Sequence, residues 1–239
     1  MNSSSLQMRD GTDPTTVPIL YDDQDVLAVA KPEGLASIPT RDHSEESLLT
    51  RLAAALAEKV YVVHRLDKEA SGIILFARNA AAHRHLNEQF SHGQVRKTYL
   101  ALAHGLLEAE TGVIDQPLRE FGSGRVAVDL ERGRPCTTQY LRREFVGPHT
   151  LVETQPLTGR RHQIRVHFYS IGHPLVGDPR YGEAALQAGF PRLMLHAHRL
   201  EFQFPSGARA MLEAPLPPSF TAVVERCRAA LTSEKGEPS

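Results

Sequence analysis

Apolar residues in this chain occur mostly in short runs of strand length that are separated by turn-forming residues. The run IILFA at 73–77 is typical, and a run of this length is far too short to cross a bilayer. The expected strands follow one another through short turns and do not alternate regularly with helices. This pattern predicts an α+β fold with a mixed, largely antiparallel β-sheet core and flanking helices, and it argues against a doubly wound parallel sheet.

The elements can be placed from periodicity and turn residues. Strands are predicted in PILYDDQDVLAVAKPEG (two, around an acidic turn), YVVHRLD, GIILFARN, VRKTYLALAHG and TLVETQPL, with a strand pair in LMLHAHRLEFQFP. Helices are predicted in SEESLLTRLAAALAE, in AAAHRHLNEQFSHG up to Gly93, after TGRR up to Gly172, and in PSFTAVVERCRAAL.

The length and composition are those of an ordinary globular protein, with 239 residues, 41% hydrophobic and 23% charged. Such a length suits one large domain or two closely joined lobes. We expect a folded domain at 17–231 between polar, disordered tails at 1–16 and 232–239. No export signal is visible, and the two cysteines are far apart and form no CxxC pair. This fits a cytoplasmic protein without a disulfide framework.

Charge is unevenly distributed along the chain. The net charge is −1, which by itself gives no support for a nucleic-acid partner. Between Arg119 and Arg165, however, the sequence contains nine arginines and only five acidic residues. A local positive face of this kind can dock phosphates while distant acids cancel the total charge. An ordinary solvated face remains the alternative.

The first candidate site is the charged segment HRLDKEASG, residues 64–72. The apolar residues YVV precede it and IILFA follows it, so the segment is expected to be a loop braced by two buried strands. Catalytic groups are frequently carried by such loops. A solvated turn is the alternative interpretation, but four charged groups this close to a core favour a site.

The second candidate is TGRRHQIRVH, residues 158–167. Gly159 permits a tight turn before a helix whose buried stripe is expected at Ile164, Phe168 and Ile171. Arg161 and Arg165 lie on the shoulder of that stripe. Arginines at a helix N-terminus oppose the helix dipole, a placement that makes sense if an anion binds there. Ordinary surface arginines are the alternative.

The remaining motifs give weaker evidence for a site or argue against particular classes of function. Tyr99, in Lys97-Thr98-Tyr99, fits half-buried packing or base stacking. The histidine pairs His83/His85 and His196/His198 lack zinc-ligand spacing, so no metal is expected. The sequence contains no GxGxxG, GxxxxGK[ST] or GxSxG motif, which argues against dinucleotide-binding, P-loop and α/β-hydrolase functions.

Five segments, in order along the chain, resemble the RluA/RsuA family of RNA pseudouridine synthases. KPEGLASIPT is similar to the family's KPxG turn, HRLDKEASG to HRLDxxTSG, and KTYLALAHG to the K-x-Y strand. LTGRRHQIRVHFYSIGHPLVGDPRYG resembles the block GRxHQIRxH…GHPIxGDxxYG, and RLMLHAHRLEFQFP resembles LHA…FxHP. Ala70 stands where the family commonly has Thr. The chain is expected to be the short form, without an extra N-terminal RNA-binding domain.

The resemblance implies a cofactor-free enzyme with a central RNA-binding cleft, which isomerises uridines in structured rRNA, tRNA or both. The sequence does not show the oligomeric state, and we expect a monomer. It implies that Asp67 attacks the ribose anomeric carbon or removes a ribose proton on a glycal route, and both routes stay open. Arg165 is implied as the charge partner of Asp67, and Tyr99 as the ring that stacks on uracil. The implied RNA contacts are Arg65, which fills the gap left by the flipped base, and His64, Arg160, Arg161 and His162.

Two rival functions remain at this point. One is a catalytically inactive RNA-binding protein of the same fold, although the presence of Asp67, Tyr99 and Arg165 together favours an active enzyme. The other is a metal-dependent hydrolase built on the histidines, which a chelator would inactivate.

Overall fold

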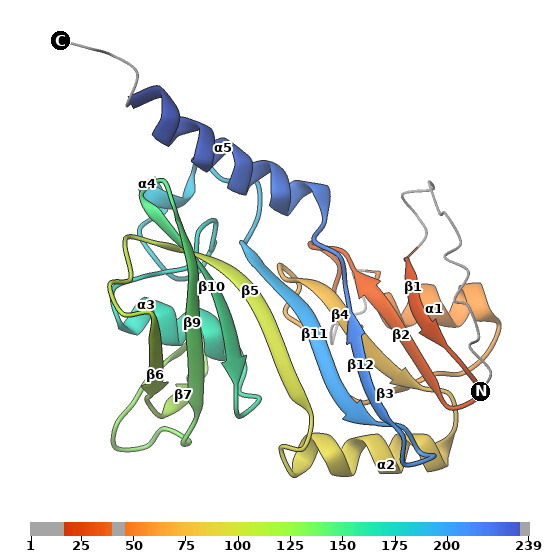
Figure 1. Ribbon diagram of the computed structural model, residues 1–239. Coiled ribbons are helices and arrows are strands. Elements are labelled where there is room, and N and C mark those ends of the chain that lie inside the picture. The colour runs from red at the N-terminus through yellow and green to blue at the C-terminus, as the bar shows by residue number, and fades with distance from the viewer. Residues whose placement is uncertain (1–16, 40–45, 235–239) are drawn as a thin grey trace. The chain divides into compact units, whose positions relative to one another are not determined.

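The computed structural model describes residues 17–39 and 46–234 (Figure 1). The chain divides into two compact units, unit 1 (Met1–Arg96 with Ala197–Pro215) and unit 2 (Lys97–His196 with Leu216–Ser239). The predicted N-terminal tail lies outside the described residues. The last helix, α5 (Pro218–Glu234), continues beyond residue 231, so the helix extends into the segment predicted as a C-terminal tail.

Unit 1 is built on antiparallel strands. They are β1 (Ile19–Asp22), β2 (Val26–Lys31), β3 (Tyr61–Val62), β4 (Ser71–Ala77), most of β11 (Leu195–Gln203), and β12 (Arg209–Glu213). The order is β1-β2-β4-β11, with β3 paired to β4 and β12 paired to β11. Every residue of β4 is buried, which explains why its sequence is apolar throughout instead of alternating.

Two helices complete unit 1. In α1 (Leu48–Leu56), Ser47 and Thr50 form a capping box, and Leu48 and Leu52 pack against Leu27 and Phe76 of the sheet. Helix α2 (Ala80–Ser91) is capped by Asn79 and contacts β3 and β4. Gly93 follows α2 in the left-handed conformation, at φ 67°, as the predicted stop requires.

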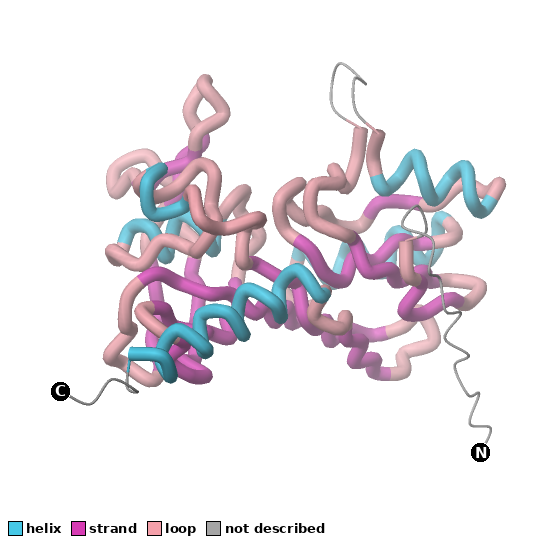
Figure 2. The backbone as a smooth tube through the Cα atoms, turned by 90° about the horizontal axis from the view of Figure 1, so that it is seen from above, coloured by secondary structure: helices cyan, strands magenta, loops and turns pink. Residues whose placement is uncertain are grey.

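Unit 2 is built on a second set of antiparallel strands. They are β5 (Arg96–His104), β6 (Thr111–Asp115), β7 (Leu118–Glu120), β8 (Val126–Val128), β9 (Thr137–Val146) and β10 (His149–Pro156). The order is β5-β10-β9-β6, and β7 and β8 form a separate hairpin. Between β10 and β11 the chain is mostly loop, interrupted by α3 (Gln163–Ser170) and α4 (Ala184–Gln187) (Figure 2).

The helices of unit 2 pack in different clusters. Helix α5 buries Phe220, Val223 and Val224 with Leu102 and Met194. Helix α3 contributes Val166 to a cluster with residues of the β7–β8 hairpin and with Tyr181. The predicted end of α3 at Gly172 is confirmed, since the helix stops at Ser170 and Gly172 is left-handed at φ 83°.

The architecture confirms the predicted α+β class with a largely antiparallel sheet, but two local predictions were wrong. YVVHRLD was expected to be a strand, yet only Tyr61–Val62 is extended. LMLHAHRLEFQFP was expected to hold a strand pair, yet it contains the single strand β11, whose hairpin partner is the following β12. In the described part of the chain no helix is long and apolar enough to span a membrane.

Candidate active site

Asp67 lies in unit 1, in the loop that joins β3 to β4 at residues 63–70. Leu66 before it is 7% exposed and Ala70 after it is 1% exposed, whereas Asp67 itself is partly exposed. Arg65 and Lys68 are exposed. The loop is therefore anchored by its apolar residues and leaves Arg65 and Lys68 exposed. Of the two buried strands expected to brace it, β4 is buried throughout, whereas β3 is only partly buried.

Two side chains, Lys31 at the end of β2 and Ser37 in the segment after it, hold this loop on either side of Asp67. Ser37 Oγ accepts a hydrogen bond from Leu66 N (3.0 Å) and donates one to Leu66 O (2.8 Å). The Nζ of Lys31, a residue only 1% exposed, donates to Lys68 O at 3.2 Å and to two carbonyl oxygens of its own turn. Gly34 N also donates to Lys68 O, at 2.8 Å. The backbone immediately before and after Asp67 is thus fixed by hydrogen bonds to residues 31–37.

His64 supports the loop from inside unit 1. Its Nε2 accepts a hydrogen bond from Leu75 N at 2.9 Å, and its ring stacks on Phe90 with centroids 4.6 Å apart. Its lone pair satisfies a main-chain N–H of β4. A role in packing is therefore visible for His64, while its predicted RNA contact stays a prediction.

Ala70, at the position where the related motif has Thr, is buried at the end of the Asp67 loop. Its N–H donates to Asp67 O at 3.2 Å, so this residue closes the turn that carries Asp67. Gly72, two residues on, has φ 120°, and a Cβ there would lie 2.2 Å from Ala197 O. Only glycine fits this close approach of β4 to β11.

Arg165 lies in unit 2 and is completely buried on α3, not on the shoulder of the helix as predicted. Its Nε donates to Asp178 Oδ2 and its Nη2 to Asp178 Oδ1, both at 2.8 Å. Asp178 is also fully buried, and its Oδ1 accepts the N–H groups of Arg180 (2.9 Å) and Tyr181 (3.2 Å). This bidentate, charge-assisted pair sets the orientation of the guanidinium group.

The turn before α3 is organised by Gln163. Its Oε1 accepts from Thr158 Oγ1 (2.7 Å) and from Arg160 N (3.0 Å), and its Nε2 donates to Thr137 O and Thr138 Oγ1, both at 3.0 Å. His162 adopts a left-handed conformation at φ 53°, which is uncommon for a residue other than glycine. The side chain of Gln163 therefore holds the turn together and ties it to β9.

His162 is 8% exposed, and its Nδ1 lies 2.8 Å from Tyr181 Oη. Burial raises the pKa of Tyr181, so its hydroxyl stays protonated at neutral pH. Arg165 lies over the Tyr181 ring, 5.3 Å from its centroid. The buried His162 ring therefore supports Tyr181, while Gly159 and Arg160 form the exposed part of the turn.

The other predicted site residues of unit 2 are closer to the surface. Arg160 is exposed, and Arg161 Nη1 is paired with Glu120 Oε1. Tyr99 is partly exposed on β5, opposite Thr154 of β10. Two residues earlier, Lys97 Nζ donates to Thr158 O at 2.9 Å, and burial lowers the pKa of this lysine. Lys97 thus links the Tyr99 strand to the turn that precedes α3.

The histidine pairs do not form a metal site in the described part of the chain, where no group of three or more His, Cys, Asp or Glu side chains could hold an ion. On α2, His83 Nε2 lies 3.1 Å from Val62 O and His85 Nε2 lies 3.1 Å from Gln203 O. These two neighbouring histidines therefore bind different strands.

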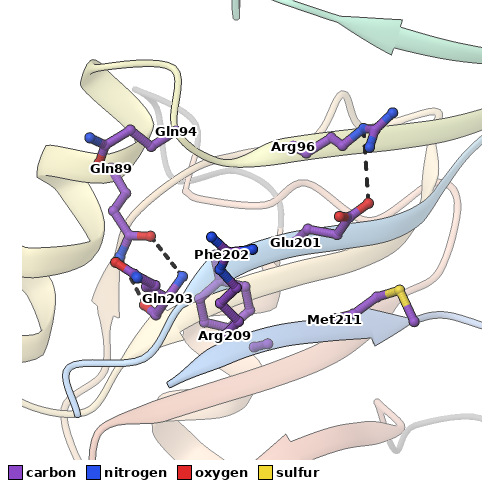
Figure 3. A pocket seen from close by; sticks show the side chains of 9 residues that line it. Gln89, Gln94, Arg96, Glu201, Phe202, Gln203, Arg209 and Met211 are labelled. Atoms are coloured by element: carbon purple, nitrogen blue, oxygen red, sulfur yellow. Dashed lines mark hydrogen bonds and ion pairs between the residues drawn. The ribbon is translucent and has the colours of Figure 1, made fainter. Parts of the chain in front are cut away.

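Unit 1 also has an open cavity of about 440 Å³ at the end of α2 and beside β11 and β12 (Figure 3). Gln89 bonds both main-chain groups of Gln203 there, and Arg96 Nε lies 3.9 Å from Glu201 Oε1. None of the predicted catalytic or RNA-binding residues lines this cavity. It is therefore not part of the candidate active site.

Several residues with clear roles in these two regions were not among those predicted. Lys31 and Ser37 lie in KPEGLAS, and Asp178 and Tyr181 lie in GDPRYG. Both segments had been noticed as motifs, but no role had been assigned to their side chains. In the sequence, the available signal was a lysine and an aspartate inside turn-forming segments. The structure shows that both are buried, and a buried charged group must find partners inside the protein.

The chain is similar to known proteins over most of its length. Residues 25–170 match the family described as RNA pseudouridylate synthase. The chain is 37% identical over 226 residues to the uncharacterized RNA pseudouridine synthase YlyB of Bacillus subtilis, covering 90% of this chain and 74% of that protein. It is 37% identical over 197 residues to the dual-specificity RNA pseudouridine synthase RluA of Escherichia coli K12, covering 81% of this chain and 90% of that protein.

The same relationship appears among solved structures. The structure of human RNA pseudouridylate synthase domain containing 1 matches with a TM-score of 0.75 and 27% identity, covering 97% of this chain and 99% of that one. Human RNA pseudouridylate synthase domain containing 4 matches with a TM-score of 0.72, also at 27% identity, covering 88% of this chain and 92% of that one.

Proposed function

The chain belongs to the RluA-type RNA pseudouridine synthases, which isomerise uridine in RNA to pseudouridine, and we propose that Asp67 is its catalytic nucleophile. The observation that carries the proposal is the pair of main-chain clamps around this residue. Ser37 binds Leu66, and Lys31 and Gly34 bind Lys68, while the Asp67 side chain stays partly exposed. A reactive carboxylate needs this combination of a fixed backbone and an accessible side chain.

The reaction needs no change of oxidation state. The bond from ribose C1′ to uracil N1 breaks, the base turns, and a bond from C1′ to uracil C5 forms. The proton on C5 is lost and N1 gains one. Asp67 either bonds to C1′ as uracil leaves, or takes the C2′ proton to give a glycal, and both routes return the carboxylate unchanged. Both fit a carboxylate acting without a cofactor.

Arg165 and Tyr99 are proposed to assist Asp67 from unit 2. The ion pair with Asp178 engages Nε and Nη2 of Arg165 and fixes the orientation of its guanidinium group. We assign Arg165 to stabilising the ionised form of Asp67, because a nearby cation favours a carboxylate. Tyr99 is assigned to stacking on the uracil and to the removal of the C5 proton.

The substrate is proposed to be a stem-loop of rRNA or tRNA, as the resemblance of the motifs to the family implies. The target uridine must be flipped out of its stack, at a cost of a few kcal/mol. Arg65, exposed on the nucleophile loop, is proposed to fill the gap, and the exposed Arg160 to bind phosphate. We further propose that the enzyme works in the cytoplasm as a monomer.

The test is Asp67→Asn, compared with Glu69→Gln on the same loop. RNA from cells that contain only Asp67→Asn is expected to lose one or a few pseudouridines, mapped by chemical labelling. The purified variant should convert RNA slower by about three orders of magnitude or more, because the reacting group is removed. Glu69→Gln should retain the pseudouridines.

Two outcomes would contradict the proposal. An active Asp67→Asn enzyme would show that another residue is the nucleophile. A wild-type protein that binds RNA but converts no uridine would favour the inactive RNA-binding alternative.

A further inference from the structure

The loop at residues 177–182 of unit 2, which carries Asp178, closes around the side chain of Gln187. Gln187 is the last residue of α4 and is 9% exposed. Its Oε1 accepts a hydrogen bond from Gly177 N at 2.6 Å. At the other end of the loop, a Cβ on Gly182 would lie 2.6 Å from Gln187 Nε2, so any larger residue there would displace this side chain. One carboxamide group therefore contacts both ends of the loop.

Gln187 also binds the strand that carries Tyr99. His104 Nε2 lies 3.2 Å from the same Oε1. Because Gly177 N donates to this atom, it must be the amide oxygen, which can only accept. His104 Nε2 therefore carries the proton and donates to it. His104 and Tyr99 both lie on β5, so the oxygen of Gln187 joins the Asp178 loop to the Tyr99 strand.

The same loop sets the position of Arg165. Asp178 follows Gly177 directly, and its carboxylate orients the Arg165 guanidinium group through two hydrogen bonds of 2.8 Å. The main-chain bond of Asp178 itself, from its N to Leu175 O, is long at 3.3 Å. The bond from Gly177 N to Gln187 is the shorter of these two main-chain contacts. A shift of the loop would move the carboxylate, and the guanidinium group would move with it.

The two ends of the Gln187 amide are used differently. Its oxygen accepts from two donors, whereas its Nε2 is buried and has no hydrogen-bond partner among the described residues. A side chain chosen for packing alone would not need a buried amide group at this position. The oxygen is therefore the part of the residue that the fold uses.

We propose that Gln187 is a positioning residue for the isomerisation of uridine, which acts on Arg165 through the loop that carries Asp178. Gln187 itself contacts no reacting atom in this scheme. The inference rests on the proposed function, and in particular on the role assigned there to Arg165. A displacement of about 1 Å in a catalytic group can lower a rate by up to about a hundredfold, so a lost support can slow the reaction without removing any reacting group.

The experiment uses the full chain and a synthetic stem-loop containing the uridine that Asp67→Asn cells fail to modify. Gln187→Met keeps the length of the side chain and removes Oε1, so kcat should fall about tenfold while KM stays nearly unchanged. Gln187→Glu keeps an oxygen at this position and should retain kcat within about twofold of wild type. If the methionine variant does not fold, Gln187→Asn takes its place, because its side chain is too short to reach Gly177 N.

Gln89→Met is the matched control. Gln89 is 5% exposed in unit 1, and its carboxamide also binds the main chain, donating to Gln203 O and accepting from Gln203 N, both at 2.8 Å (Figure 3). The same substitution there removes two buried hydrogen bonds outside the candidate active site. Gln89→Met should therefore lower the melting temperature and keep the kcat of wild type.

A second measurement needs no RNA. In protein labelled with ¹⁵N-arginine, the Nε–H signal of Arg165 is identified as the one that Arg165→Lys lacks. This N–H is buried against Asp178, so its exchange with water reports how often the pair opens. Exchange should be about tenfold faster in Gln187→Met than in wild type, and unchanged in Gln89→Met.

The proposal is overturned if Gln187→Met keeps the kcat of wild type, or if Gln187→Glu is as slow as Gln187→Met. It is also overturned if kcat falls while the exchange at Arg165 stays that of wild type, since the effect would then not pass through the Asp178 loop. Failure of the proposed function looks different. In that case wild type itself would not convert the stem-loop, and the inference would fall with it even though the exchange at Arg165 still responded to Gln187→Met.

Discussion

The Asp67 loop of unit 1 and the Arg165 helix of unit 2 fix their side chains in opposite ways. The loop is held through its main chain, by Ser37 on Leu66 and by Lys31 on Lys68, and the Asp67 side chain is partly exposed. Arg165 is held through its side chain, by two hydrogen bonds to Asp178, and none of it is exposed.

This difference follows from what each group is proposed to do. A nucleophile must reach the substrate, so its position is set by clamping the neighbouring backbone. A buried cation must be compensated and oriented, so its position is set by a carboxylate that binds it directly. Loss of a support should therefore destabilise the fold most in unit 2 and affect mainly the rate in unit 1.

The largest effect on stability is expected for Asp178→Asn. The substitution removes the charge that compensates a fully buried guanidinium, and breaking such a pair costs about 3–5 kcal/mol. Urea unfolding at neutral pH should show this loss. The control is Glu144→Gln, which breaks the exposed pair with Arg228 and should cost less than about 1 kcal/mol. Equal stabilities of the two variants would contradict the role given to Asp178.

A smaller effect on stability, with a larger one on rate, is expected for Ser37→Ala. The substitution removes both hydrogen bonds to Leu66, at a cost of about 2 kcal/mol. A displaced Asp67 should lower kcat by about tenfold to a hundredfold, with KM nearly unchanged. Ser91→Ala, which removes an exposed hydroxyl that donates to Glu88 O at 2.9 Å, is the matched control. If Ser37→Ala keeps its full kcat, the clamp does not position the nucleophile.

The same contrast explains how much of the fold was predictable from the sequence. Local signals worked where they act locally, as at the glycine stops after α2 and α3. The strand prediction for YVVHRLD failed because His64, not a partner strand, satisfies Leu75 N. An apolar run predicts burial, but it does not show which group will take each main-chain hydrogen bond.

The candidate site was likewise predictable only in part. Its motifs could be read directly, but the partners that position them lie far away in the sequence: Ser37 is 29 residues from Leu66, and Asp178 is 13 residues from Arg165. The arginine-rich segment predicted a positive face, yet Arg119, Arg143 and Arg161 are paired with acids. Helical and strand periodicity reports which face is buried and does not report long-range partners.

The stability of unit 2 should depend on pH through His149 of β10. This residue is 7% exposed, and burial, with a smaller contribution from nearby His104, lowers its pKa to about 4. Because the unfolded chain binds the proton at its ordinary pKa of about 6.5, stability should fall as the pH drops from 6.5 towards 4. Between pH 7 and pH 5 this group alone should cost about 2 kcal/mol.

His149→Phe tests this prediction. Phenylalanine keeps the ring contacts with His104 and Phe190, and no hydrogen bond of His149 Nδ1 is lost, since that atom has no partner among the described residues. Urea unfolding at pH 7, 6 and 5 should show the variant close to wild type at pH 7 and about 2 kcal/mol less sensitive to acid by pH 5. His92→Gln, at the exposed end of α2, should keep the wild-type pH dependence. Parallel curves for His149→Phe and wild type would show that the acid response arises elsewhere.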